Sequence, residues 1–110
     1  MADITGLIRG DDHTINVTFP TDITGSTVFF TVNEESDPAS DTTAAIKIEN
    51  TVHTDALNGK TTFILAPETT AVMSTGVYFY DFQLKTAGGI ISSTPKAKFV
   101  LESDITRRTI

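Results

Sequence analysis

Apolar and polar residues alternate along this chain over short stretches, and each stretch ends in residues that are common in turns. The clearest case is 13–19, where Ile15, Val17 and Phe19 alternate with polar neighbours. A period of two residues is typical of a strand that buries one face. Turn residues recur roughly every 8–12 positions, a spacing that favours a sandwich or barrel of short strands.

The same pattern can be followed through the whole chain. We expect strands at 3–9 (or an N-terminal arm in its place), 13–19, 26–33, 45–50, 60–66, 77–85, 90–93 and 96–102. One helical turn is expected in 67–73, because Pro67 suits the start of a helix. Asn58-Gly59 predicts a type I′ hairpin turn, and Pro95 predicts a break in a strand at the edge of a sheet.

The stretch 73–84 leads from a polar corner into the most aromatic run of the chain. The spacing from Gly76 to Tyr78 fits a tyrosine corner, in which the hydroxyl group bonds back to the backbone just before the strand. Tyr80 then takes the buried position where antibody domains carry a cysteine, and Phe82 follows on the same face. We predict that Gly76, Tyr78, Tyr80 and Phe82 determine the fold.

These patterns predict an all-β protein, an immunoglobulin-like antiparallel β-sandwich of seven or eight short strands in a single domain covering residues 1–110. Val28, Phe30 and Val32 should face its core. Phe29 and Phe79 should then point away from the core on central strands. A shared outward apolar patch is rare on a monomer, so both residues are candidates for binding a partner. The alternative is a one-residue register shift, or cover of this face by the N-terminal arm.

Composition excludes several kinds of chemistry and argues against some partners. The chain has no cysteine, which excludes disulfides and thiol catalysis. Its net charge of −6 argues against nucleic acid as the main partner, because neutralising phosphates requires a surplus of Lys and Arg. The acidic N-terminus does not resemble a signal peptide, and no apolar run approaches the length of a membrane span, so we expect synthesis in the cytoplasm and no membrane contact.

Three groups could carry site chemistry, and each has an ordinary explanation. Asp11-Asp12-His13 could ligate a metal, as could His53 with Asp55, but neither spacing matches a metal framework. The acids of 34–41 could bind calcium, yet they lack EF-hand spacing. We favour solvated turn residues in all three cases, and expect no metal and no cofactor.

Catalysis has no visible constellation either. No serine lies in an elbow motif, and paired carboxylates occur only in turns that should be exposed. Arg9-Gly10-Asp11 matches an integrin-type tripeptide and Asn16-Val17-Thr18 matches a glycosylation sequon, but a turn and a strand explain them. We expect the protein not to be an enzyme.

The order of motifs resembles a known family. The motifs are Arg9-Gly10-Asp11, 22–32, 45–48, 59–63, Thr69-Thr70, 76–83 and Asp104-Ile105-Thr106. Together they resemble the small immunoglobulin-like domains of tailed-bacteriophage virion proteins, and are similar to the N-terminal domain of phage baseplate upper proteins.

This resemblance implies a virion structural protein, made in the host cytoplasm, that binds other virion proteins in the tail, the baseplate or the capsid decoration. It implies a homo-oligomer, with a trimer as one form, or an array on a symmetric partner. Phe29, Phe79 and the basic pair Arg107 and Arg108 are the candidate contacts. The alternative is a host-surface or carbohydrate-binding module using the 34–41 loop.

Overall fold

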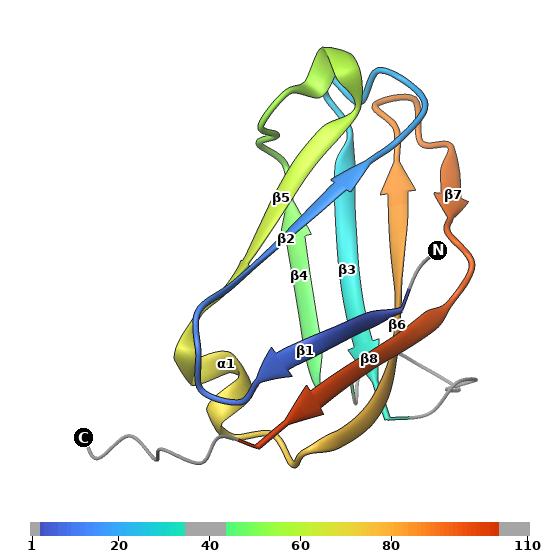
Figure 1. Ribbon diagram of the computed structural model, residues 1–110. Helices are drawn as coiled ribbons and strands as arrows, with labels where there is room; N and C mark the ends of the chain where they lie inside the picture. Colours follow the sequence, from blue (N-terminus) through green and yellow to red (C-terminus); the bar gives the residue numbers. More distant parts are fainter. Residues whose placement is uncertain (1–2, 35–43, 104–110) are drawn as a thin grey trace.

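Strands dominate the computed structural model, which describes residues 3–34 and 44–103 (Figure 1). Eight strands are present in the described residues: β1 (Ile4–Ile8), β2 (His13–Thr18), β3 (Thr27–Asn33), β4 (Ile46–Asn50), β5 (Lys60–Leu65), β6 (Gly76–Lys85), β7 (Ile91–Ser93) and β8 (Ala97–Glu102). Two short helices accompany them, the 3-10 helix η1 (Ala56–Asn58) and α1 (Pro67–Ala71). The expected all-β class is confirmed, and so is the helical turn that begins at Pro67.

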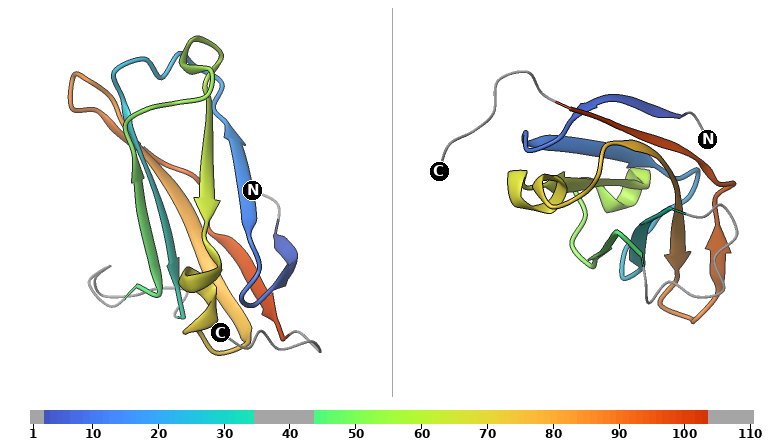
Figure 2. Two further views of the ribbon diagram at one scale, coloured as in Figure 1. Left: turned by 90° about the vertical axis from the view of Figure 1, so that its left-hand side faces the viewer. Right: turned by 90° about the horizontal axis from the view of Figure 1, so that it is seen from below.

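The strands form two sheets. The main sheet has the order β1-β8-β6-β3-β4, with β7 also paired to β6, and the small sheet is β2-β5. The left view of Figure 2 shows the two sheets as separate layers with the small sheet facing the main one. Inward side chains from both layers fill the space between them.

The main sheet is mixed, so the expected purely antiparallel arrangement was wrong at one pair. β1 runs parallel to β8, with Ile4 opposite Phe99 and Leu7 opposite Leu101. The reason is the place of the first turn. Because the chain crosses from the main sheet to the small sheet between β1 and β2, those two strands cannot form a hairpin, and β1 lies along β8 instead.

Aromatic rings from three strands meet in the core. Phe30 on β3 lies with its ring centroid 5.1 Å from that of Phe82, 5.4 Å from that of Phe63 and 5.8 Å from that of Tyr80. Phe30, Phe63 and Phe82 are at most 2% exposed. Burying one such ring stabilises the fold by about 2–3 kcal/mol, and the tilted and edge-on contacts add to this. The inward positions predicted for β3 and β6 are therefore confirmed.

The corner before β6 has the predicted hydrogen bond. The hydroxyl group of Tyr78 donates to the carbonyl oxygen of Ser74 at 2.7 Å, and the ring of Tyr78 is buried. Burial raises the pKa of Tyr78, with a smaller contribution from the charge of Glu34. Gly76 begins β6 with φ of 143°, in the region that favours glycine. The sequence thus specified this corner locally.

The hairpin before β5 differs from its prediction, because β4 and β5 lie in different sheets and only an isolated bridge between Asp55 and Lys60 closes it. A type I′ turn needs two residues with positive φ, whereas only Gly59 has one here, at 75°. The residues of η1 form a 3-10 turn instead, and Asp55 pairs with Lys60 by two backbone hydrogen bonds of 2.9 and 3.1 Å. Packing explains the longer turn, because the carbonyl of Gly59 accepts a hydrogen bond from the N–H of Phe19 at 2.8 Å.

The interruption predicted at Pro95 is confirmed. β7 and β8 both pair with the same side of β6, at Gln83–Lys85 and at Gly76–Tyr80, and Pro95 lies between them. Thr94 holds the break against β6, since its N–H donates to Phe82 O at 2.9 Å and its Oγ1 accepts from Phe82 N at 3.0 Å.

Candidate functional site

The outer face of the main sheet carries both outward phenylalanines, but they do not form one patch. Phe29 is opposite Gln83 on β6, whereas Phe79 is opposite Asn33. Four residues along a strand separate these positions by about 13 Å. Both rings are half-buried. The expected shared apolar patch is thus replaced by two separate positions.

Asp81 on β6 is opposite Thr31 on β3, and it lies between the positions of Phe29 and Phe79 along the sheet. It is half-buried, and this burial raises the pKa of its carboxyl group. A charged group at this position divides the outer face into two regions. Phe29 occupies one region, and Phe79 occupies the other.

Phe79 has apolar company on its side of Asp81. Val77 lies two positions earlier on β6 and is 53% exposed, and it is opposite the half-buried Val100 on β8. Residues two apart on a strand share a face, so Val77, Phe79 and Val100 form a small apolar cluster, with Lys98 at its border. This cluster is the best-supported part of the predicted contact surface.

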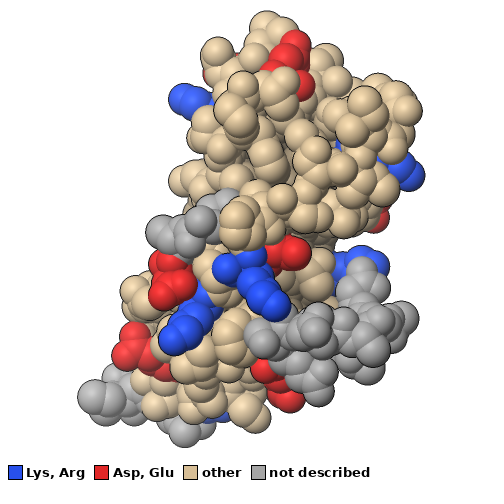
Figure 3. Space-filling view, turned by 90° about the vertical axis from the view of Figure 1, so that its right-hand side faces the viewer, with Lys and Arg blue, Asp and Glu red and all other residues tan. Residues whose placement is uncertain are grey.

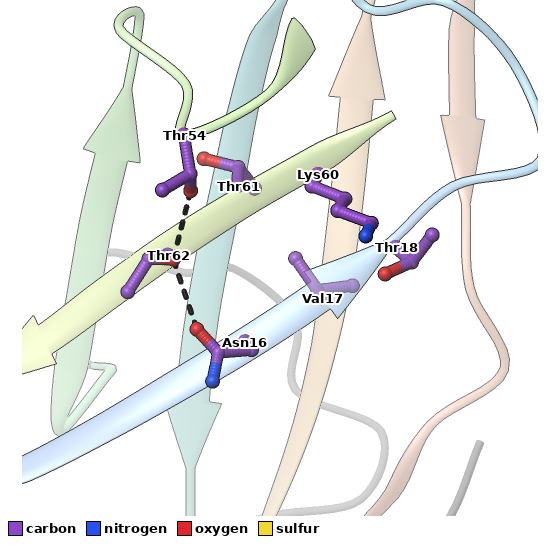
Figure 4. Close-up of a pocket in the computed structure, with 7 residues that line it drawn as sticks. All are labelled: Asn16, Val17, Thr18, Thr54, Lys60, Thr61 and Thr62. Atoms are coloured by element: carbon purple, nitrogen blue, oxygen red, sulfur yellow. Dashed lines mark hydrogen bonds between the residues drawn. The ribbon is translucent and has the colours of Figure 1, made fainter. Parts of the chain in front are cut away.

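A hollow on the outer face of the small sheet was not predicted. It has a volume of about 290 Å³ and is lined by Asn16, Val17, Thr18, Thr54, Lys60, Thr61 and Thr62 (Figure 4). A chain of hydrogen bonds crosses it: Thr54 Oγ1 lies 2.8 Å from Thr62 Oγ1, which donates to Asn16 Oδ1 at 2.9 Å. The rim therefore carries hydroxyl groups, an amide and the Lys60 ammonium group.

Partly buried polar contacts hold the floor of this hollow in place. The side-chain N–H of Asn50 donates to Thr61 Oγ1 at 3.2 Å and to Thr62 O at 2.7 Å. His53 Nε2 donates to Ser26 O at 2.8 Å, and its Nδ1 lies 3.0 Å from Thr61 Oγ1. Both ring nitrogens of His53 therefore make structural contacts, which join Ser26, directly before β3, to Thr61 on β5. No local sequence signal could reveal this network, because its members lie 8 to 27 positions apart.

The other candidate ligands have structural partners as well. His13 Nε2 donates to Ile8 O at 2.8 Å, and Asp11 and Asp12 are exposed. Within residues 3–34 and 44–103, no group of three or more His, Asp or Glu side chains is placed to hold a metal ion. Arg107, Arg108 and most of the acidic 34–41 loop lie outside the described residues.

The free edge of β7 is a further surface that the sequence reasoning missed. Ile90 and Ile91 are 68% and 57% exposed, although both are large aliphatic residues. Figure 3 faces the side that carries β7, and charged side chains gather over its lower half while the upper half is mostly uncharged. The signal in the sequence was the pair of isoleucines directly after the Gly88-Gly89 turn.

Comparisons with known proteins do not assign the chain to a family. No protein-family model matches the sequence, and no curated protein matches it significantly. Among the described residues, no helix has the length and apolar character needed to cross a membrane.

Proposed function

We propose that this chain is an immunoglobulin-like module of a bacteriophage virion that acts by binding other virion subunits. The observation that supports the immunoglobulin-like part of the proposal is the strand order together with the tyrosine corner. In this proposal β2 and β5 correspond to strands B and E, while β3, β6 and the interrupted β7–β8 correspond to C, F and G. β4 adds the strand that extends the sheet in variable-type domains. The Tyr78–Ser74 bond at the start of β6 matches the same plan.

The ionisable groups favour binding over catalysis. Asp22 accepts hydrogen bonds from the hydroxyl and the N–H of Thr24, which lower the pKa of its carboxyl group, as in an ordinary turn. The two histidines contact backbone carbonyls, as described above. The Thr61 hydroxyl lies 3.0 Å from His53 Nδ1, but Thr61 is only 1% exposed, so this pair is closed to a substrate of acyl transfer or hydrolysis.

The fold alone does not indicate a virion, because immunoglobulin-like sandwiches serve many functions. That part of the proposal comes from the resemblance of the sequence motifs to tailed-phage structural domains. The cluster of Val77, Phe79 and Val100 provides a surface suited to a subunit contact.

Mass spectrometry of virions is the direct test. Particles from the phage or prophage that encodes the chain should retain it in constant ratio to the major capsid protein through successive gradient purifications. Abundant host cytoplasmic proteins serve as the control and should decline at each step. A chain that is abundant in the lysate and declines with the host proteins would contradict the proposal.

A point variant tests the contact surface within this proposal. Phe79→Ser should lower incorporation into particles without unfolding the domain, because Phe79 lies outside the core. Thr31→Ser, on the same outer face, is the matched control. Incorporation that is equal for the two variants would exclude the Phe79 cluster as the contact.

The hollow on the small sheet favours a second candidate function, a host-surface or carbohydrate-binding module. Hydroxyl and amide groups around a shallow depression suit the hydroxyl groups of a sugar, and Lys60 suits a sugar that carries a carboxylate. A glycan array tests this directly. Hits that are lost in Asn16→Ala and Thr62→Ala but kept in Thr14→Ala, which lies on the same strand outside the hollow, would support it. An array without hits would exclude it.

A further inference from the structure

The backbone of β7 presents hydrogen-bonding groups on its outer edge. Thr94 N donates to Phe82 O, and Thr86 N donates to Ile90 O. Thr94 and Ile90 are therefore hydrogen-bonded to the strand β6 and to the residue that follows it. Hydrogen-bonded pairs alternate with non-bonded pairs along an antiparallel ladder. Ser92 and Leu84 are therefore the hydrogen-bonded pair that lies between these two. The N–H and C=O groups of Ile91 and Ser93 therefore point away from β6, and no strand pairs with them in the described residues.

The side chains along this edge offer little protection against pairing. From Ile90 to Thr94 the sequence is Ile-Ile-Ser-Ser-Thr, without a charge, and both isoleucines are exposed. Natural sheets protect open edges with charged residues, bulges, proline or cover by another segment. Within the described residues, such protection comes only from the shortness of β7 and from Pro95, two positions after its end.

The other edges of the main sheet are better protected. β4 carries exposed Lys47 and Glu49. β8 is covered by β1, and β1 has an irregular register between Ile4 and Leu7, with Gly6 at φ of 75°. Charges, cover and a bulge are the devices that prevent edge pairing, so β7 is the exception in this sheet.

We infer that two copies of this chain pair antiparallel through their β7 edges, around a two-fold axis at Ser92. In this register the outward N–H and C=O groups of Ile91 meet those of Ser93 of the second copy, and the symmetric pair forms in the same way. Four backbone hydrogen bonds result, and the two main sheets become one continuous sheet. Each Ile91 side chain covers Ser93 of the second copy on the outer face.

The occupant is a second copy because the edge complements itself. It presents the same two donors and two acceptors after a two-fold rotation, and it places no like charges opposite each other although each chain carries a net charge of −6. The three-residue length of β7 and Pro95 limit the contact, so the pairing is weak and reversible. Such a pair is one form of the homo-oligomer expected from the sequence, and it forms whether or not the chain belongs to a virion.

Sedimentation velocity of the full chain over protein concentrations from about 10 µM to about 1 mM, the range of weak complexes, tests the pairing. The average mass should rise from monomer toward dimer. Ile91→Lys should raise the dissociation constant by about tenfold or more, because it places a charge in the edge. Ser93→Pro should have a similar effect, since it removes an outward N–H that β6 does not use.

Val72→Lys is the matched control, because Val72 is 88% exposed and follows α1 at the other end of the molecule. It should leave the dissociation constant unchanged. Hydrogen exchange at high concentration should slow at the amides of Ile91 and Ser93. A chain that stays monomeric at about 1 mM, or a dimer that Ile91→Lys and Ser93→Pro leave intact, would overturn the inference. Neither result would affect the virion test.

Discussion

Two hairpins lie at the same end of the molecule, and each contains a glycine with positive φ, yet the fold uses them differently (Figure 1). The hairpin at 55–60 is bonded to the rest of the protein, because Phe19 N donates to Gly59 O and Ile23 N donates to Ala56 O. The hairpin at 86–90 closes mainly on itself, through Gly89 N to Thr86 O and Thr86 N to Ile90 O.

The two glycines differ in how closely other atoms surround them. An added Cβ at Gly59 would lie 2.6 Å from the carbonyl oxygen of Thr21 and closer still to that of Phe19. At Gly89, with φ of 88°, an added Cβ would meet nothing within 4 Å. The first hairpin is therefore part of the core packing, while the second leaves the β7 edge accessible to a partner.

Gly59→Ala should cause the largest change. The substitution combines left-handed strain of about 1–2 kcal/mol with a clash against two fixed carbonyl groups, so it should lower the free energy of unfolding by about 3 kcal/mol or more. Urea denaturation followed by circular dichroism measures this. A loss below about 1 kcal/mol would show that the hairpin can move away from Phe19, and the contrast between the hairpins would fail.

Tyr78→Phe should cause an intermediate loss of stability, because it removes one side-chain hydrogen bond at the corner and leaves the ring packed. The free energy of unfolding should fall by about 1–2 kcal/mol. The same denaturation measurement applies. Val77→Ala, at the exposed neighbouring position, is the control and should change stability by less than about 0.5 kcal/mol.

Gly89→Ala should cost only about 1 kcal/mol, because the strain of positive φ remains and the clash is absent. Comparing it with Gly59→Ala in one denaturation series sharpens the contrast between the two hairpins. Equal losses for the two variants would mean that backbone strain alone sets both values and that packing around Gly59 contributes nothing.

Asp81→Asn should have the smallest effect, and its sign depends on pH. Burial raises the pKa of Asp81 in the folded state above its ordinary value of 3.8, so the cost of the carboxylate is absent below that value and appears as pH rises through the folded pKa. The variant should be more stable than the parent at neutral pH, by no more than about 0.5 kcal/mol because solvent screens this half-exposed group, and equal to it in acid. Denaturation at both pH values checks this, and a benefit confined to acid would contradict it.

Local features of the fold could be predicted from the sequence. Strand faces followed from alternation, α1 from Pro67, and the hydrogen bond of Tyr78 from a spacing of only four residues to Ser74. Such features depend on residues only a few positions apart, so the local residue pattern predicts them.

The candidate surfaces were harder to predict from the sequence. Phe29 and Phe79 are on the predicted face, but only the register of β3 against β6 places Asp81 between them. The hollow and the His53 network depend on groups from three separate segments. The Ile90-Ile91 pair could have been noticed, although its exposure follows from the absence of a covering strand in the described residues.

By itself, the sequence determined the all-β class, the inward aromatic set and the corner before β6, because side-chain period and short-range hydrogen bonds are properties of local chain. Tertiary structure alone decided that β1 joins β8 in parallel, that an added Cβ would clash at Gly59 but not at Gly89, and that no second strand among the described residues pairs with β7. Those outcomes depend on which distant strands become neighbours, and alternation along one strand carries no information about its partner.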